Sequence, residues 1–256
     1  MLRLKTFGGL AVRNEHGPLY GAAVRRRPLA LLALVAGAGS DGVSRDKVVA
    51  YLWPESDTAH ARNSLKQTLF ALRHGLPGSL FDPGGTTLRL DPHAVAVDRW
   101  EFDRALEGGA LRDAVELYKG PFLDGFYLER GLAFEHWVEA ERRRLANRYQ
   151  GALERLAACA EAAGDREAAV GWWQRLAEHD PFSCRIALGL MEALVAVGDR
   201  ASALHYAVRH ERLLREELDT SPDTRERAYV QQLGKRAGVS ALCAISAFSG
   251  HVIGLG

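Results

Sequence analysis

The sequence predicts a mainly α-helical protein with small antiparallel strands near its N-terminus and paired helices in its second half. Three observations carry this prediction. Residues 2–24 alternate between apolar and polar side chains and break at glycines, as short strands do. Residues 44–73 have the pattern of two helices joined at a proline turn. A Gly-Asp-Arg segment recurs after 34 residues, which is the period of tetratricopeptide helix pairs.

Charge is distributed unevenly along the chain, although the net charge is only +1. Residues 1–100 contain 13 Lys and Arg against 8 Asp and Glu, whereas residues 101–256 contain 20 against 24. This distribution favours a part that binds nucleic acid followed by a part that binds protein. The three cysteines lack the spacing of metal ligands, and no secretion signal opens the chain. Both features predict a cytoplasmic protein.

Three helices are expected after the strand segment. The first opens at Pro28, a residue suited to the first turn of a helix, and ends at Gly37. Ser44 is the expected N-cap of the second helix. Ser56 or Asp57 is the expected N-cap of the third, which is the most informative element of the chain.

The third helix has two chemically different faces when each residue is turned by about 100° from the one before. Its apolar side collects Ala61, Leu65, Leu69, Leu72 and Leu76. Its other side carries six candidate DNA-binding residues: Arg62, Asn63, Lys66, Gln67, Phe70 and Arg73. Arg, Asn and Gln bond base edges in the major groove, while Lys mostly neutralises phosphate. An ordinary amphipathic surface helix also exposes Arg and Lys, so this face alone leaves both interpretations open.

The end of the first domain has the pattern of a β-hairpin. Two alternating runs in residues 81–98, separated by Asp91-Pro92, predict a hairpin that ends near Asp98. Short strands, three helices and a terminal hairpin together fit a winged helix-turn-helix over residues 1–98. In that fold the third helix enters the major groove and the hairpin lies on the DNA backbone. Arg89, in the hairpin, is therefore the seventh candidate DNA-binding residue.

From residue 99 the composition shifts to Ala, Leu, Glu and Arg with helical spacing. The repeated Gly-Asp-Arg segments predict tetratricopeptide-like helical repeats over residues 99–236, and a generic helical bundle is the alternative. The uncharged segment VSALCAISAFSGHVIGLG has only 18 residues, whereas a bilayer span needs roughly 20 strongly apolar residues. Residues 237–256 include four glycines and three serines, so we expect them to form a loosely packed tail. We expect the two domains to be separable, with a fragment that ends near Trp100 folding alone.

The remaining motifs weigh against catalysis. Gly37 to Gly42 match the glycine pattern of dinucleotide-binding loops, but that site requires a strand before the loop. Pro28 and the excess of Leu and Ala in the preceding run favour a loop between two helices instead. We therefore predict no enzyme activity, no cofactor and no metal site. The run Arg25 to Arg27 either contacts phosphate or is solvated, and Arg142 to Arg144 are expected on a salt-bridged helix face.

With these pieces in place, the chain resembles the SARP-type family of bacterial regulators. That family joins an OmpR-type winged helix to a bacterial transcriptional activator domain built of tetratricopeptide repeats. The matching segments of the first half are LRLKTFGGLAV, RRRPLALLALVA, Val43 to Asp46 with Tyr51 to Pro54, and Ala61 to Leu65 leading to Leu72-Arg73. Those of the second half are Tyr118 to Phe126, Trp137 with Glu141 to Leu145, Asp180 to Phe182, Leu190-Met191 and Glu217 to Pro222. The resemblance covers residues 1–236.

The resemblance implies a cytoplasmic transcription regulator, most often an activator. Such a protein binds repeated half-sites on double-stranded promoter DNA and contacts RNA polymerase, and two copies can pair into a homodimer. No membrane partner is implied. The competing class is a repeat-containing adaptor that binds proteins without binding DNA specifically.

Overall fold

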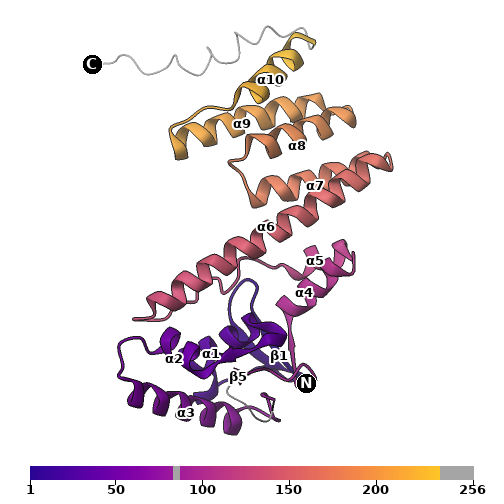
Figure 1. Cartoon of the computed structure of the whole chain (residues 1–256). Helices are drawn as coiled ribbons and strands as arrows, with labels where there is room; N and C mark the ends of the chain where they lie inside the picture. Colours follow the sequence, from indigo (N-terminus) through magenta and orange to yellow (C-terminus); the bar gives the residue numbers. More distant parts are fainter. Residues whose placement is uncertain (83–86, 237–256) are drawn as a thin grey trace, which may run out of the picture. The chain divides into compact units, whose positions relative to one another are not determined.

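The computed structural model describes residues 1–82 and 87–236 and divides into two compact units, of which the second begins at Leu153. The predicted fold class is confirmed, since the chain is mainly helical with small antiparallel strands near the N-terminus (Figure 1). Residues 99–152 belong to the same compact unit as the strands and the first three helices. The predicted boundary at residue 98 between a DNA-binding domain and an activator domain therefore stays a prediction about how the functions divide, and it is not the boundary between the compact units. The expected tail, residues 237–256, lies outside the described residues.

The sheet of the first unit is built around strand β1 (Leu2–Lys5) and has the order β3-β2-β1-β6. Strand β2 (Ala11–Asn14) pairs with β1 in antiparallel fashion, and β3 (Gly17–Pro18) pairs with β2. Strand β6 (Val95–Val97) runs parallel to β1 on its other side. Leu4, opposite both Val12 and Val97, is buried, so the alternation of β1 reflects one face turned to the core.

Three helices follow the first strands, as the sequence predicts. The 3₁₀ helix η1 (Ala22–Val24) leads into α1 (Arg26–Gly37), whose Leu31 and Val35 are fully buried. The short helix η2 (Gly39–Asp41) and strand β4 (Val43–Ser44) lead into α2 (Arg45–Leu52). Ser44 caps α2, because its hydroxyl accepts from the Lys47 N–H at 3.2 Å. Helix α3 (Thr58–Gly75) packs on α1 and α2.

The predicted hairpin over residues 81–98 is wrong in its pairing. Strand β5 (Thr87–Leu88) pairs with β4, and Val95–Val97 pairs with β1 instead of with the preceding run. The chain turns at Asp91, whose N–H donates to the Leu80 carbonyl and whose carbonyl accepts from the Val95 N–H. Among the described residues, the antiparallel bridge between Phe81 and Leu90 and the pairing of β5 with β4 mark the position of the wing.

Residues beyond the predicted winged helix complete the core of the first unit. They form α4 (Asp98–Glu107), α5 (Leu111–Leu117) and the first part of α6 (Leu132–Ala162). The ring of Phe7 is fully buried, with its centroid 5.3 Å from that of Phe102 and 4.9 Å from that of Tyr118. The Asp98 carboxylate accepts from the N–H groups of Thr6 and Phe7 at 2.8–3.0 Å. The turn after β1 thus rests on residues that follow the wing.

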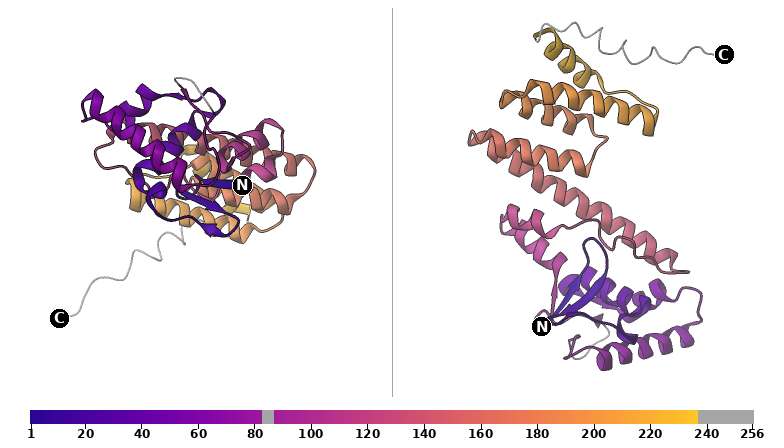
Figure 2. Two further views of the ribbon diagram at one scale, coloured as in Figure 1. Left: turned by 90° about the horizontal axis from the view of Figure 1, so that it is seen from below. Right: turned by 180° about the vertical axis from the view of Figure 1, so that it is seen from behind.

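The second unit stacks the end of α6 with α7 (Arg166–His179), α8 (Cys184–Ala196), α9 (Arg200–Leu218) and α10 (Thr224–Arg236). Both views in Figure 2 show α7 to α10 packed as successive layers. Asp165 and Asp199 cap α7 and α9 in the same way, each accepting from a backbone N–H three residues later at 3.0 Å. The Gly-Asp repeat therefore marks equivalent turns of two helix pairs, as predicted.

Glycine also permits close packing between these helices. A Cβ atom at Gly189 would lie 2.5 Å from the Trp173 ring, so α7 and α8 approach through this pair. Across the described segments, no helix combines the length and the apolar character that a bilayer span requires.

Candidate DNA interface

Helix α3 begins at a charged cap. The Asp57 carboxylate accepts from the backbone N–H groups of Ala59 and His60, each at 3.0 Å, and it contacts the His60 ring. These hydrogen bonds, the one from the His60 backbone foremost, hold the pKa of Asp57 below its usual value. The carboxylate therefore stays ionised at neutral pH and favours the positive end of the helix dipole.

The two predicted faces of α3 are separated in the structure as the periodicity requires. The apolar residues Ala61, Leu65, Leu69, Leu72 and Leu76 are all buried. The candidate residues Arg62, Asn63, Lys66, Gln67, Phe70 and Arg73 are all exposed on the other side. In Figure 1, α3 lies at the edge of the first unit. A helix held along one stripe and open along the other can enter a groove of DNA without repacking its core.

The polar side chains of this face are held to different degrees. Arg62 pairs with Asp46 of α2, with Nη2 3.2 Å from Oδ1, although both side chains are more than half exposed. The Phe70 ring is 63% exposed and stacks on His74 with a centroid distance of 3.9 Å. Such an exposed aromatic ring on a polar face is available to a partner.

Arg89 lies directly after strand β5 and not on α3. Its Nε donates to the Asp41 carbonyl at 3.3 Å, and its guanidinium remains exposed. Gly42 allows this approach: a Cβ atom there would lie 2.4 Å from Arg89 Cγ and 2.6 Å from the Leu88 carbonyl oxygen. With a φ of 68°, Gly42 also adopts a backbone conformation that favours glycine.

The same geometry removes the dinucleotide-binding interpretation of Gly37 to Gly42. The apolar run before the loop is helix α1, and the loop continues through η2 into the two-residue strand β4. A dinucleotide loop requires a strand before it and a helix that starts at the loop. The segment therefore connects two helices, as the favoured interpretation has it.

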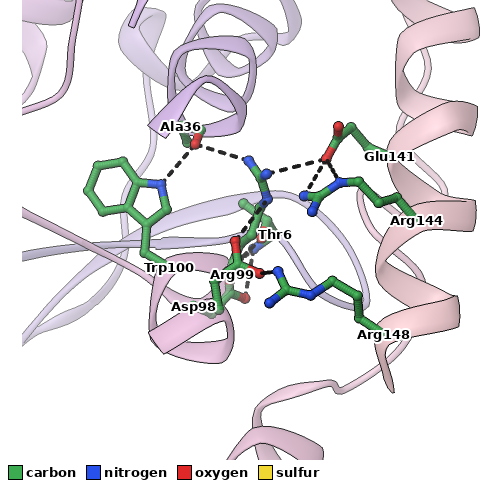
Figure 3. Close-up of polar contacts among 9 residues, drawn as sticks. Thr6, Ala36, Asp98, Arg99, Trp100, Glu141, Arg144 and Arg148 are labelled. Atoms are coloured by element: carbon green, nitrogen blue, oxygen red, sulfur yellow. Dashed lines mark hydrogen bonds and ion pairs between the residues drawn. The ribbon is translucent and has the colours of Figure 1, made fainter. Parts of the chain in front are cut away.

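A buried arginine, which sequence reasoning missed, connects α1 to the elements after the wing (Figure 3). Arg99 Nη1 donates to the Ala36 carbonyl at 3.2 Å, and its Nη2 lies 3.3 Å from Glu141 Oε2 on α6. The Trp100 indole donates to the same carbonyl at 2.8 Å. Carbonyls at the C-terminal end of a helix lack partners within it, so Arg99 and Trp100 complete the end of α1.

Carboxylates of α4 and α6 lie between Arg99 and two further arginines. Burial lowers the pKa of Arg99, while Glu141 and Asp103 act in the opposite direction. Glu141 also accepts from Arg144 at 2.9 Å, and Asp103 pairs with Arg148. The expected salt-bridged face of α6 is thus present.

Arg142 of the same run has an additional role. It pairs with Glu139 at 3.3 Å and also donates to the carbonyls of Phe122 and Leu123, each at 2.7 Å. Arg142 therefore holds the segment before α6 against this helix, in addition to forming an ion pair.

Comparison with protein families decides the identity of the second half. The model of the bacterial transcriptional activator domain matches residues 94–233. The chain belongs to this family. The match begins inside the first compact unit, at β6, so the activator domain includes α4, α5 and the Arg99 cluster as well as the helical repeats.

The activator-domain chain is also similar in fold to a solved structure. Mycobacterium tuberculosis EmbR, in complex with a low-affinity phosphopeptide, matches with a TM-score of 0.62 at 18% sequence identity. The match covers 96% of this chain and 70% of that chain. Together with the family match, this likeness supports the SARP-type resemblance, including the strands and three helices that precede the activator domain. A comparison with curated proteins gives no match.

Proposed function

We propose that this protein is a sequence-specific, DNA-binding transcription regulator, and specifically an activator. The observation that carries the proposal is the exposed face of α3, which presents two arginines, a lysine and two amides on a helix anchored by a buried leucine stripe. In the proposed complex α3 lies in the major groove of double-stranded promoter DNA. Membership of a transcriptional activator family supports the same function.

Each candidate residue has a proposed role that follows from its chemistry. Arg62, Asn63 and Gln67 bond base edges, and Phe70 contacts a thymine methyl group. Lys66 neutralises phosphate, as do Arg73 near the end of the helix and Arg89 on the wing. The Asp46 carboxylate accepts from only one nitrogen of the Arg62 guanidinium, so the remaining N–H groups stay available to a base.

The helical repeats supply the second half of the proposal. Their surface contacts RNA polymerase or a second copy of the chain, so that two half-sites are bound together with a gain in effective concentration. The protein acts in the cytoplasm, without a cofactor and without catalysing a reaction. The alternative is a repeat adaptor that binds proteins and lacks specific DNA binding.

Selection from a random DNA pool separates these two functions. The purified full chain is incubated with the pool at moderate salt, bound DNA is recovered by gel shift, and the recovered DNA is sequenced after several rounds. A regulator enriches a repeated motif with half-sites spaced by a whole number of helical turns. Recovery of DNA without an enriched motif would favour the adaptor.

A further inference from the structure

A groove beside α3 is lined by the arginine run whose role the sequence left open. Arg25, Arg26 and Arg27 lie along one wall together with Trp53. The other wall is formed by α3 residues, among them Ser64 and Gln67. No Asp or Glu lines this groove within the part of the chain that the structure describes. The groove is thus positively charged along the arginine run and open to an anion.

The three arginines differ in how they are held. Arg27 donates to the Leu52 carbonyl and its guanidinium lies 5.6 Å from the Trp53 ring centroid, so it builds the wall. Arg26 donates to the Tyr127 carbonyl at 3.0 Å and lies 4.0 Å above the Tyr127 ring. Arg25 is exposed, and the described residues include no side-chain partner for it. Arg25 is therefore the arginine most available to a ligand.

Gln67 lines this groove and also belongs to the exposed face of α3 that we propose binds DNA. When α3 lies in the major groove, a DNA strand that borders that groove passes the flank of the helix. We propose that the arginine groove binds a backbone phosphate of this strand through Arg25 and Arg26, and that Tyr127 of the activator domain positions Arg26. This inference rests on the proposed function and extends it to residues outside α3 and the wing.

Tyr127 holds Arg26 in a defined position, which distinguishes this groove from a general positive surface. It lies in the segment between α5 and α6, 101 residues from Arg26, and belongs to the activator domain. Its ring and carbonyl together hold a flexible arginine in one place, which lowers the entropy lost when phosphate binds. Part of the DNA affinity is thus set by a residue that does not itself touch DNA.

The test uses the full chain, a duplex that carries the selected motif, and a random duplex of equal length. Arg25→Ala should weaken binding to both duplexes by about tenfold and reduce the slope of log affinity against log salt by about 0.9. Tyr127→Ala should weaken both by about threefold, whereas Tyr127→Phe retains the ring and the carbonyl and should match the parent. Arg13→Ala, on strand β2, removes an exposed charge elsewhere and is the matched control.

A methylphosphonate scan locates the contact. Neutralising the phosphate that the groove binds should weaken the parent but not Arg25→Ala, because the two changes remove the same interaction. The inference is overturned if the parent, Arg25→Ala and Arg13→Ala bind DNA with equal affinities and salt slopes. The groove would then not bind a DNA phosphate. If Arg62→Ala still loses discrimination between the duplexes in that case, the proposed function stands. If the parent shows no motif preference, both fail.

Discussion

Arg99 and Glu141 form a buried ion pair in which Nη2 and Oε2 are 3.3 Å apart and the side chains are 8% and 17% exposed. Arg99 lies in the first turn of α4, and Glu141 lies on α6. Arg99 also completes the end of α1 through the Ala36 carbonyl. Both partners belong to the activator domain, and the hydrogen bond of Arg99 to Ala36 links this domain to α1 within one compact unit.

Glu141→Leu should destabilise the protein by about 3 kcal/mol, because it leaves the buried Arg99 guanidinium with only the more distant Asp103 carboxylate, 3.9 Å from its Nε. The double variant Arg99→Met with Glu141→Leu should lose less than the sum of the two single changes. Glu139→Leu is the control on the same helix. Glu139 is 58% exposed, and its pair with Arg142 should contribute at most about 1 kcal/mol. Urea unfolding of the parent, the two single variants, the double variant and Glu139→Leu measures these differences, and equal losses for Glu141→Leu and Glu139→Leu would contradict a structural role of the pair.

The boundary of the smallest folded fragment should lie near residue 152 and not near Trp100. A fragment ending at Trp100 lacks Phe102 and Tyr118, which cover the buried ring of Phe7. It should therefore expose apolar surface and bind a hydrophobic dye, whereas residues 1–152 should unfold cooperatively. In the full chain, Phe7→Ala should cost about 3–5 kcal/mol. Cooperative unfolding of the shorter fragment would support the boundary that composition alone suggests.

The loop between α1 and α2 offers two glycines with different expected costs. Gly39 has a φ of 58° and open space around a Cβ atom, so Gly39→Ala should cost about 1 kcal/mol through the backbone alone. Gly42→Ala should cost more, because its Cβ would also meet the Leu88 carbonyl and Arg89. Thermal unfolding compares the two variants.

The same loop should not respond to nucleotides. Added ATP or NAD should leave the melting temperature of the parent unchanged. A nucleotide bound there would stabilise the fold by about 2.7 kcal/mol at a hundredfold excess over its dissociation constant. A saturable shift abolished by Gly39→Ala would reverse our account of this segment.

The second unit contains a buried pair that should behave as a unit. His210 Nδ1 lies 2.8 Å from Glu226 Oε1, and both side chains are 1% exposed. Glu226→Leu or His210→Leu alone should cost about 3 kcal/mol or more, since each leaves a buried polar partner. The double leucine variant should cost less than the sum of the two. Urea unfolding gives the coupling energy, and additive losses would contradict the pairing.

The elements that sequence predicted best are those whose signals are local. The face of α3 could be predicted because its leucines repeat at helical spacing behind a carboxylate cap, and both features act within a few residues. Sequence also predicts the two turns of the repeats, because glycine ends one helix and aspartate caps the next. These turns are Gly164-Asp165 and Gly198-Asp199.

The features that sequence did not predict depend on contacts between distant segments. An alternating run at residues 95–97 is equally suited to a hairpin or to a parallel strand, and only the position of β1 decides between them. Arg99 bonds a carbonyl 63 residues away, which no spacing rule reveals. Composition changes near residue 100, but Phe7 takes its neighbours from beyond that point, so the compact unit extends past the change.

The central claim is that α3 reads DNA sequence, and affinities of two variants on two DNAs test it most directly. Arg62→Ala should cost about 1–3 kcal/mol on the selected motif and little on random DNA, because a base contact is lost. Lys66→Ala should weaken both DNAs alike and flatten the salt dependence, because a phosphate contact is lost. Titrations of each variant at several salt concentrations give all of these values. Small and equal losses on both DNAs for both variants would contradict the assignment of α3 as the recognition helix.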